Sequence, residues 1–239
     1  MRRQLPITIK RGGRIFEKTL HLFTWKELAV YSKAHPPKLW ENLGSGIWYV
    51  RICAIQSRDT LKRLFSDIQQ AKTVIWDLRA YPNFNVTQVV GNGLFDHDFV
   101  STISFNGMLF YPGSFVKHMG AAYGKIDDFK LGLYKGRMIV LVSEQTQSLA
   151  ESLAYELRQR PNTVVMGRQT AGTTGNIVWV DYPGGISVSF TGVGVTGLKA
   201  SFEEGKGVKI DKKIRLTTRN LIKYPDYVLH QAYELALKE

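Results

Sequence analysis

The spacing of hydrophobic residues changes at about residue 46, and the predicted elements change with it. Apolar and polar residues alternate on both sides of Gly12-Gly13, which predicts a β-hairpin over residues 8–20. A two-stranded hairpin is marginally stable by itself, so we expect its sheet to include strands upstream of Met1. Proline and glycine clusters over residues 24–45 predict a linker.

Beyond residue 46, apolar runs bounded by turn residues alternate with amphipathic segments. The apolar runs predict strands at 47–55, 73–78, 138–142, 163–166, 177–180, 186–190 and 192–195. The amphipathic segments predict helices at 59–70, 148–159 and 226–237. Strands separated by single helices favour an α/β fold with parallel pairing. The section from about residue 83 to 135 is too weakly patterned to assign.

Composition and charge narrow the class of protein. The 239 residues are 44% hydrophobic, enough for a core, and no apolar run approaches the roughly 18 residues that a membrane span needs. The formal net charge of +12 favours attraction to polyanions or anionic lipid. The basic residues are spread over segments of different type, without a recognisable reading helix. We therefore interpret them as a solvated face and expect no specific nucleic-acid site.

Cysteine and histidine spacing argues against bound metals. The single cysteine, Cys53, lies in an apolar run, and we expect it to be an inert core residue. No histidine has metal-ligand spacing to a second histidine or cysteine, and no phosphate-binding loop follows a strand, so we expect no metal and no cofactor. The residues after Met1 lack the apolar core of a secretion signal. The protein is either intracellular, or the chain starts after a missing leader.

The segment from Val142 to Glu151 is the most informative part of the sequence. A buried strand ends there, a polar turn follows, and a helix begins at Ser148. In one interpretation Ser148 and Glu151 form a capping box. In the other, Ser148 is a nucleophile, and free N–H groups at the helix start bind an oxyanion. Both interpretations need the same backbone, so both stay open.

A second turn follows the predicted strand 73–78, at Pro82-Asn83-Phe84. Ligands of α/β sheets bind at the carboxyl ends of the strands, so the two turns are expected to meet there. Asp77 and Arg79 are expected to anchor the second turn by hydrogen bonds.

Four motifs in one order resemble the C-terminal processing peptidases, also called tail-specific proteases, to which the tricorn core is related. They are Asp77-Leu78-Arg79 with Pro82, Thr146-x-Ser148-x-Ala150-Glu151, Gly167–Gly172 and Gly205–Asp211. The resemblance implies a ClpP/crotonase-like α/β core over 46–239, with a mixed sheet and flanking helices. The hairpin before it resembles the last strands of a PDZ domain, which implies a PDZ-like remnant over 1–23 and a linker over 24–45.

The same resemblance assigns roles to individual residues. It implies that Ser148 is the nucleophile and that the Leu149 amide is one arm of the oxyanion hole. The other arm comes from Asn83 or Phe84, where the family usually has Gly-Gly. The implied substrate-binding residues are Thr170, Ala171 and Gly172.

The general base departs from the commonest pattern of the family. Relatives with a serine–lysine dyad carry the lysine 25 residues after the serine, where this chain has Thr173. The tricorn-like branch uses serine, histidine and glutamate, and Glu204 fits that glutamate, with Glu203 as the alternative. Its histidine precedes the PDZ domain, so we expect the base upstream of this fragment and little activity without it. His97 and His118 are interpreted as solvated.

These observations predict a serine-type endopeptidase that cleaves polypeptides through an acyl-enzyme on Ser148. The resemblance implies a bacterial protein of the periplasm or cell envelope. Two alternatives remain open: a non-catalytic peptide-binding relative in which Ser148 only caps a helix, and a basic polyanion-binding domain. The oligomeric state is not predicted.

Overall fold

The computed structural model describes residues 3–34, 38–97, 99, 102–108, 110–119, 129–198, 202–203 and 205–238. The chain divides into two compact units, Met1–Lys38 and Leu39–Glu239.

The first unit is a hairpin followed by a helix. Strands β1 (Gln4–Arg11) and β2 (Arg14–His21) pair antiparallel across the glycine turn, as the sequence predicts. Helix α1 (Trp25–Ala34) lies where the sequence predicted a linker. Its capping box explains why it forms: the Glu27 N–H donates to Thr24 Oγ1 at 3.2 Å, and the Thr24 N–H donates to Glu27 Oε2 at 2.8 Å.

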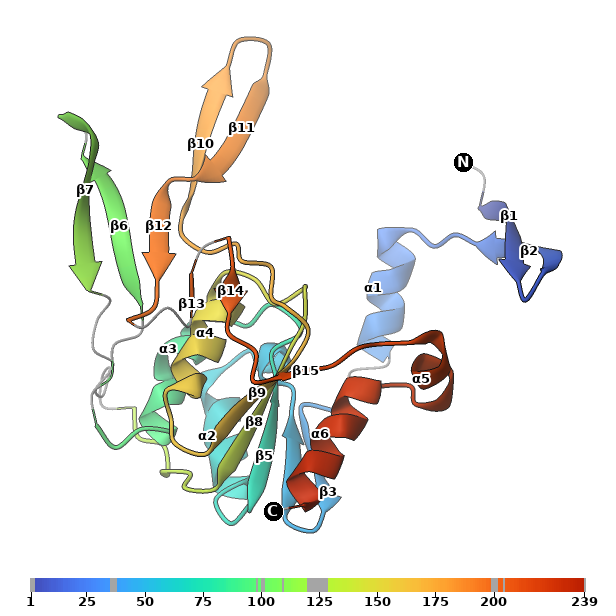
Figure 1. Cartoon of the computed structure of the whole chain (residues 1–239), viewed down its shortest axis with the longest axis horizontal. Coiled ribbons are helices and arrows are strands. Elements are labelled where there is room, and N and C mark those ends of the chain that lie inside the picture. Colours follow the sequence, from blue (N-terminus) through green and yellow to red (C-terminus); the bar gives the residue numbers. More distant parts are fainter. Residues whose placement is uncertain are drawn as a thin grey trace. The chain divides into compact units, whose positions relative to one another are not determined.

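A six-stranded mixed sheet forms the centre of the second unit, with strand order β15-β9-β8-β5-β4-β3 (Figure 1). Its strands are β3 (Trp40–Gly44), β4 (Ile47–Val50), β5 (Thr73–Asp77), β8 (Arg137–Val142), β9 (Thr163–Gly167) and β15 (Lys212–Lys213). Only β3 runs antiparallel to its neighbour; all other pairs are parallel. The predicted α/β core with parallel pairing is confirmed.

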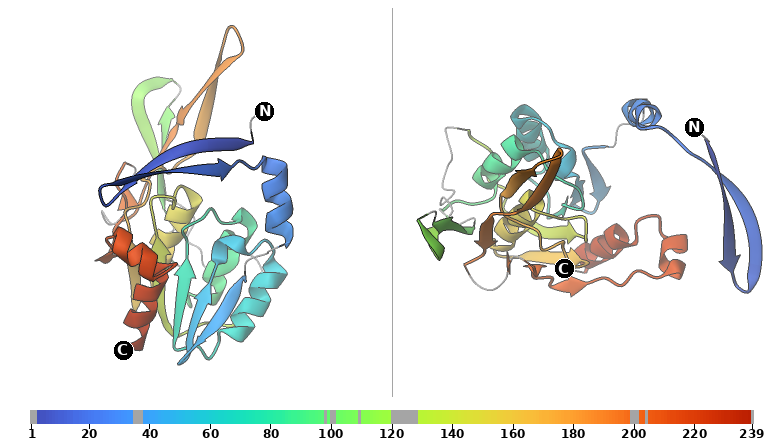
Figure 2. Two further views of the ribbon diagram at one scale, coloured as in Figure 1. Left: turned by 90° about the vertical axis from the view of Figure 1, so that its right-hand side faces the viewer. Right: turned by 90° about the horizontal axis from the view of Figure 1, so that it is seen from above.

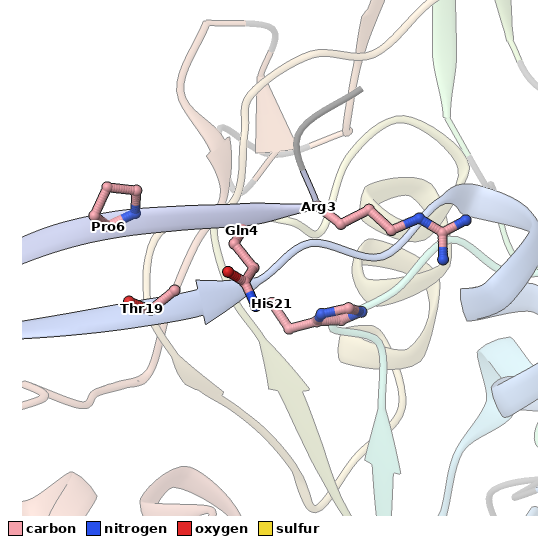
Figure 3. Close-up of a pocket in the computed structure, with 5 residues that line it drawn as sticks. All are labelled: Arg3, Gln4, Pro6, Thr19 and His21. Atoms are coloured by element: carbon pink, nitrogen blue, oxygen red, sulfur yellow. The ribbon is translucent and has the colours of Figure 1, made fainter.

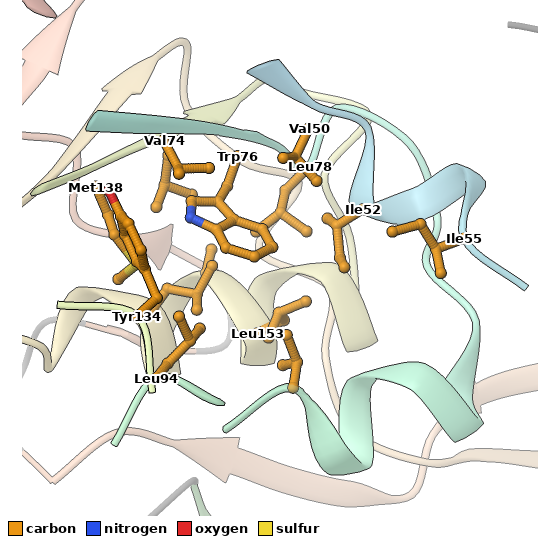
Figure 4. Packing of buried hydrophobic residues seen from close by; sticks show 14 of the residues in the cluster. Val50, Ile52, Ile55, Val74, Trp76, Leu78, Leu94, Tyr134, Met138 and Leu153 are labelled. Carbon is orange, nitrogen blue, oxygen red and sulfur yellow. The ribbon is translucent and has the colours of Figure 1, made fainter. Parts of the chain in front are cut away.

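Helices bury both faces of this sheet. The helices on one face are α2 (Arg58–Asp67), α3 (Phe84–Val90, followed by the short 3₁₀ helix η2, Gly91–Gly93) and α4 (Leu149–Arg158). Helix α6 (Tyr227–Leu237) covers the other face. Alternate residues of β5 divide between the layers: Val74 and Trp76 pack under α2–α4 (Figure 4), and Ile75 packs under α6.

A second, antiparallel sheet has the order β14-β13-β12-β6-β7. Its strands are β6 (Ile103–Met108), β7 (Tyr111–Met119), β12 (Val193–Thr196), β13 (Phe202–Glu203) and β14 (Gly207–Val208). Strands β10 (Ile177–Tyr182) and β11 (Ile186–Thr191) form a separate hairpin, at the positions of the strands predicted over 177–180 and 186–190. Strands β6 and β7 and the β10–β11 hairpin project from the core in Figure 1 and in the left view of Figure 2.

One predicted strand is shorter than expected. The strand predicted over 47–55 ends at Val50, and the 3₁₀ helix η1 (Ile52–Ala54) follows it. A 3₁₀ turn has three residues per turn, so Ile52 and Ile55 point to the same side, and both are fully buried. A continued strand would have placed them on opposite faces.

Candidate active site

Three loops meet beyond the carboxyl ends of β5, β8 and β9. Two hydrogen bonds connect them: Thr146 Oγ1 donates to Leu78 O at 2.8 Å, and the Ala171 N–H donates to Thr146 O at 3.0 Å. The turns that the sequence predicted to meet therefore do so, and the loop after β9 joins them.

Ser148 has an unusual backbone at the start of α4. Its φ of 51° and ψ of −117° lie in a region that residues with a side chain rarely adopt. Its N–H donates to Thr173 O at 2.8 Å and to Glu151 Oε2 at 3.1 Å, which holds the turn closed. The residue is partly exposed. A strained strand-to-helix turn of this kind presents the serine hydroxyl in nucleophile elbows.

Glu151 organises the backbone around this turn. Its side chain is fully buried and accepts three N–H groups, from Gly172 on Oε1 at 2.8 Å and from Thr173 and Ser148 on Oε2 at 3.1 Å each. The bond from Ser148 is the one that a capping box requires. The bonds to the loop after β9 were not predicted, because the sequence gives no signal for such a long-range contact.

The two predicted oxyanion arms begin neighbouring helices. Leu149 is the first residue of α4, Phe84 is the first residue of α3, and both line one small pocket. Within the residues that the structure describes, neither the Leu149 N–H nor the Phe84 N–H has a hydrogen-bond acceptor. The Asn83 side chain accepts the Asn85 N–H at 3.0 Å and so caps α3. Free N–H groups at two adjacent helix starts are the donors that an oxyanion requires.

The predicted substrate-binding loop is held by internal bonds. Thr170 Oγ1 is buried and accepts the Val208 N–H at 2.9 Å, and Gly172 O accepts the Gly205 N–H at 2.7 Å. Ala171 and Thr173 are exposed. The loop therefore offers Ala171 and Thr173 to solvent, whereas Thr170 and Gly172 connect it to β14 and its preceding turn.

The structure describes the predicted acids and histidines to different extents. Glu204 lies outside the described residues, and Glu203 and His118 are described by their backbone alone. His97 is exposed, and its Nδ1 lies 2.7 Å from Asp96 Oδ1. The interpretation of His97 as solvated is confirmed.

Arg79 joins the turn after β5 to the start of α6. Its guanidinium donates to Asp77 at 2.7 and 2.9 Å and to Asp226 at 2.6 and 2.9 Å, which confirms the expected anchoring role. Tyr49 Oη donates to the same Asp77 carboxylate at 2.5 Å. Burial favours the neutral form of Asp226, yet the hydrogen bonds from Arg79 and from the Leu229 N–H keep the pKa of Asp226 below its usual value. Asp226 was not predicted; its only sequence signal is its place before a helix.

Other parts of the described chain offer less chemistry. Figure 3 shows a shallow pocket on the β1–β2 hairpin that contains none of the predicted site residues; its lining residues are Arg3, Gln4, Pro6, Thr19 and His21. The described residues contain no group of three or more His, Cys, Asp or Glu that is suited to a metal ion. None of the described helices combines the length and the apolar character that crossing a bilayer requires.

Comparisons with known proteins support the family resemblance that the sequence motifs indicate. No curated protein sequence matches the chain significantly. Mature CPAF in complex with lactacystin shares the fold, with a TM-score of 0.67 and 13% identity over 98% of this chain and 67% of CPAF. A peptidase candidate from Parabacteroides merdae has a TM-score of 0.66 and 17% identity over 90% of this chain and 70% of its own length.

The photosystem II D1 C-terminal processing protease has a TM-score of 0.55 and 18% identity over 90% of this chain and 57% of its own length. These identities establish a shared fold. The sequence pattern of peptidase family S41 matches residues 104–214, which include Ser148 and the loop after β9. The resemblance to the C-terminal processing peptidases is thus confirmed: residues 104–214 match the pattern of peptidase family S41, and the chain shares its fold with CPAF and with the D1 processing protease.

Proposed function

We propose that this chain is the protease core of a serine peptidase that hydrolyses peptide bonds through an acyl-enzyme on Ser148. The backbone of Ser148 carries the proposal: a positive φ at a strand-to-helix turn, beside the Leu149 N–H, which has no acceptor among the described residues. A helix cap needs no such strain, because cap residues adopt extended backbone at no cost. Strain of this kind persists where the surrounding contacts enforce it, as the Thr173 and Glu151 bonds do here.

In the proposed reaction, Ser148 Oγ attacks the substrate carbonyl carbon, and the N–H groups of Leu149 and of Asn83 or Phe84 stabilise the oxyanion. A histidine upstream of this fragment takes the serine proton, and Glu204 orients that histidine. The histidine then protonates the leaving amine, and water hydrolyses the acyl-enzyme. The substrate lies along Thr170, Ala171 and Gly172.

The wider setting is proposed by resemblance. We place the first hairpin as the end of a PDZ-like domain and the core among ClpP/crotonase-like folds. The protein would act in the bacterial periplasm or cell envelope on polypeptide substrates.

Covalent labelling with a fluorophosphonate probe tests the nucleophile on the full-length protein. We expect labelling of the wild-type protein and none of Ser148→Ala. Ser152→Ala is the matched control, because Ser152 lies one turn later in α4 and is also partly exposed; it should label normally. Labelling that survives Ser148→Ala would refute the assignment.

A non-catalytic peptide-binding relative is the second candidate. Thr173 favours it, because the hydroxyl in the lysine position cannot accept the serine proton at neutral pH. A wild-type protein that binds peptides but never reacts with the probe would support this candidate.

A further inference from the structure

Positive charge is concentrated in the segment from Gly205 to Tyr224, here called the basic segment. It contains seven Lys and Arg residues and a single acid, Asp211. All seven cations are exposed; they are Lys206, Lys209, Lys212, Lys213, Arg215, Arg219 and Lys223. The segment therefore contributes about half of the formal net charge of +12.

The one acid of the basic segment is already neutralised. Arg158 donates to both carboxylate oxygens of Asp211 at 2.6 Å, and the Val165 N–H donates to the same carboxylate at 2.9 Å. Within the described part of the chain, Lys212, Lys213 and Arg215 take part in no ion pair. None of the described acids therefore offsets their field, and an anionic surface would displace the solvent ions that screen it.

The backbone directs several of these cations outward. Ile214 is buried against the α6 layer, so its neighbours Lys213 and Arg215 point away from the core. Helix α5 (Thr218–Lys223) follows and buries none of its residues. Figures 1 and 2 show α5, which follows β15 after residues 214–217, projecting beyond α6.

Exposed aliphatic side chains lie among the cations of α5. Ile222 is 76% exposed and Leu221 is 50% exposed. Arg219, Ile222 and Lys223 are spaced i, i+3 and i+4, so they share one face of the helix. An aliphatic tip flanked by cations is the arrangement of peripheral proteins that insert at the boundary between lipid headgroups and acyl chains.

We propose that the basic segment docks the protein on the surface of an anionic lipid bilayer. The cations are attracted by the headgroups, and Ile222 with Leu221 enters the boundary layer. The aliphatic residues distinguish this occupant from nucleic acid, which binds through cations together with stacking aromatic or base-reading side chains. The only aromatic residue of the basic segment, Tyr224, stacks on His230 with ring centroids 3.8 Å apart.

Co-sedimentation of the full chain with two kinds of vesicle tests the proposal. One kind is phosphatidylcholine alone, and the other contains added phosphatidylglycerol. We expect binding only to the second, weakening steeply as salt is raised. The triple variant Lys212→Gln, Lys213→Gln, Arg215→Gln should bind about 100-fold more weakly, since each cation near the surface contributes about 1 kcal/mol.

The matched charge control is the triple variant Lys10→Gln, Arg11→Gln, Arg14→Gln, which removes three exposed cations around the first hairpin turn. This control variant should lose less than about tenfold in vesicle affinity if the position of the cations matters. Ile222→Ser should weaken vesicle binding without changing charge, whereas Ile15→Ser, at another exposed isoleucine, should not.

Three results would overturn the proposal. One is equal loss of vesicle binding in both triple variants, and another is no vesicle binding by the wild-type protein at all. The third is equal affinity for single-stranded DNA and for anionic vesicles with no effect of Ile222→Ser on either, which would make the segment a general polyanion surface.

Discussion

The backbone N–H of Ser148 donates to the carbonyl oxygen of Thr173 at 2.8 Å. Residue 173 is the position at which the serine–lysine relatives carry their base, 25 residues after the serine. The two positions are therefore adjacent in this chain, which has threonine at residue 173. The Thr173 side chain is exposed, so a longer side chain fits without displacing core residues.

Thr173→Lys should therefore supply a base next to the proposed nucleophile. We expect the rate of fluorophosphonate labelling at Ser148 to rise at least about tenfold, because a positioned general base typically contributes more than that. The gain should increase with pH, since only the neutral amine accepts a proton. Thr173→Gln has a similar length without basicity and should show no gain. Equal rates for both variants would show that position 173 does not reach the serine hydroxyl.

Glu151→Gln tests the buried carboxylate behind the turn. Glutamine keeps one acceptor oxygen but turns an amide donor toward N–H groups that now bind carboxylate. We expect a loss of about 3 kcal/mol in the free energy of unfolding, measured by urea titration, together with slower labelling of Ser148. Glu144→Gln is the control, because Glu144 pairs with Arg168 at the surface and should cost less than about 1 kcal/mol. Comparable losses would argue against a special role of Glu151.

The elements of the central sheet were predictable because both of its faces are buried. Strands such as β5 and β8 then read as continuous apolar runs, and α4 and α6 have one apolar face each. Strands β6 and β7 were not predictable, because most of their residues remain half-buried or exposed and leave no periodic pattern. Helix α1 was not predicted, because the following Pro36-Pro37 indicated a linker, although the capping box of Thr24 and Glu27 was present in the sequence.

The candidate site was predictable as far as local motifs extend. The turn at Ser148 and the neighbouring turn at Asn83 follow strand ends, so their proximity followed from topology. The positive φ of Ser148 was not visible, since backbone strain comes from tertiary contacts such as the Thr173 bond. Asp226 was missed for the same reason, because its partner Arg79 is 147 residues away.

The Asp226–Arg79 pair predicts how stability depends on pH. The lowered pKa of Asp226 in the folded state means that the unfolded chain binds its proton more readily. The contribution of the pair is therefore complete above the unfolded pKa of about 3.9 and is lost as pH falls below it. Asp226→Asn keeps a helix-capping side chain but removes the charge.

We expect Asp226→Asn to lower the thermal midpoint at pH 7, and we expect the difference from wild type to shrink at acid pH, as the pH falls through the lowered folded-state pKa of the wild-type carboxyl. Glu234→Gln, an exposed site on the same helix, should change the midpoint little at either pH. A gap between wild type and Asp226→Asn that persists at low pH would mean that packing, not charge, explains the effect.

Cys53 offers a probe of the turn after β5. Its thiol donates to Ala80 O at 2.7 Å, and burial raises its pKa to about 12. A free thiol has a pKa near 8.5, so at pH 8 the reactive thiolate should be about a thousandfold scarcer in the folded protein. Alkylation should thus be slow until urea unfolds the chain. The double variant Cys53→Ala, Gln56→Cys, with an exposed thiol on the same loop, should react at the rate of a free thiol. Fast alkylation of Cys53 in the folded protein would show that this turn opens readily, which would argue against a fixed oxyanion arm at Asn83 or Phe84.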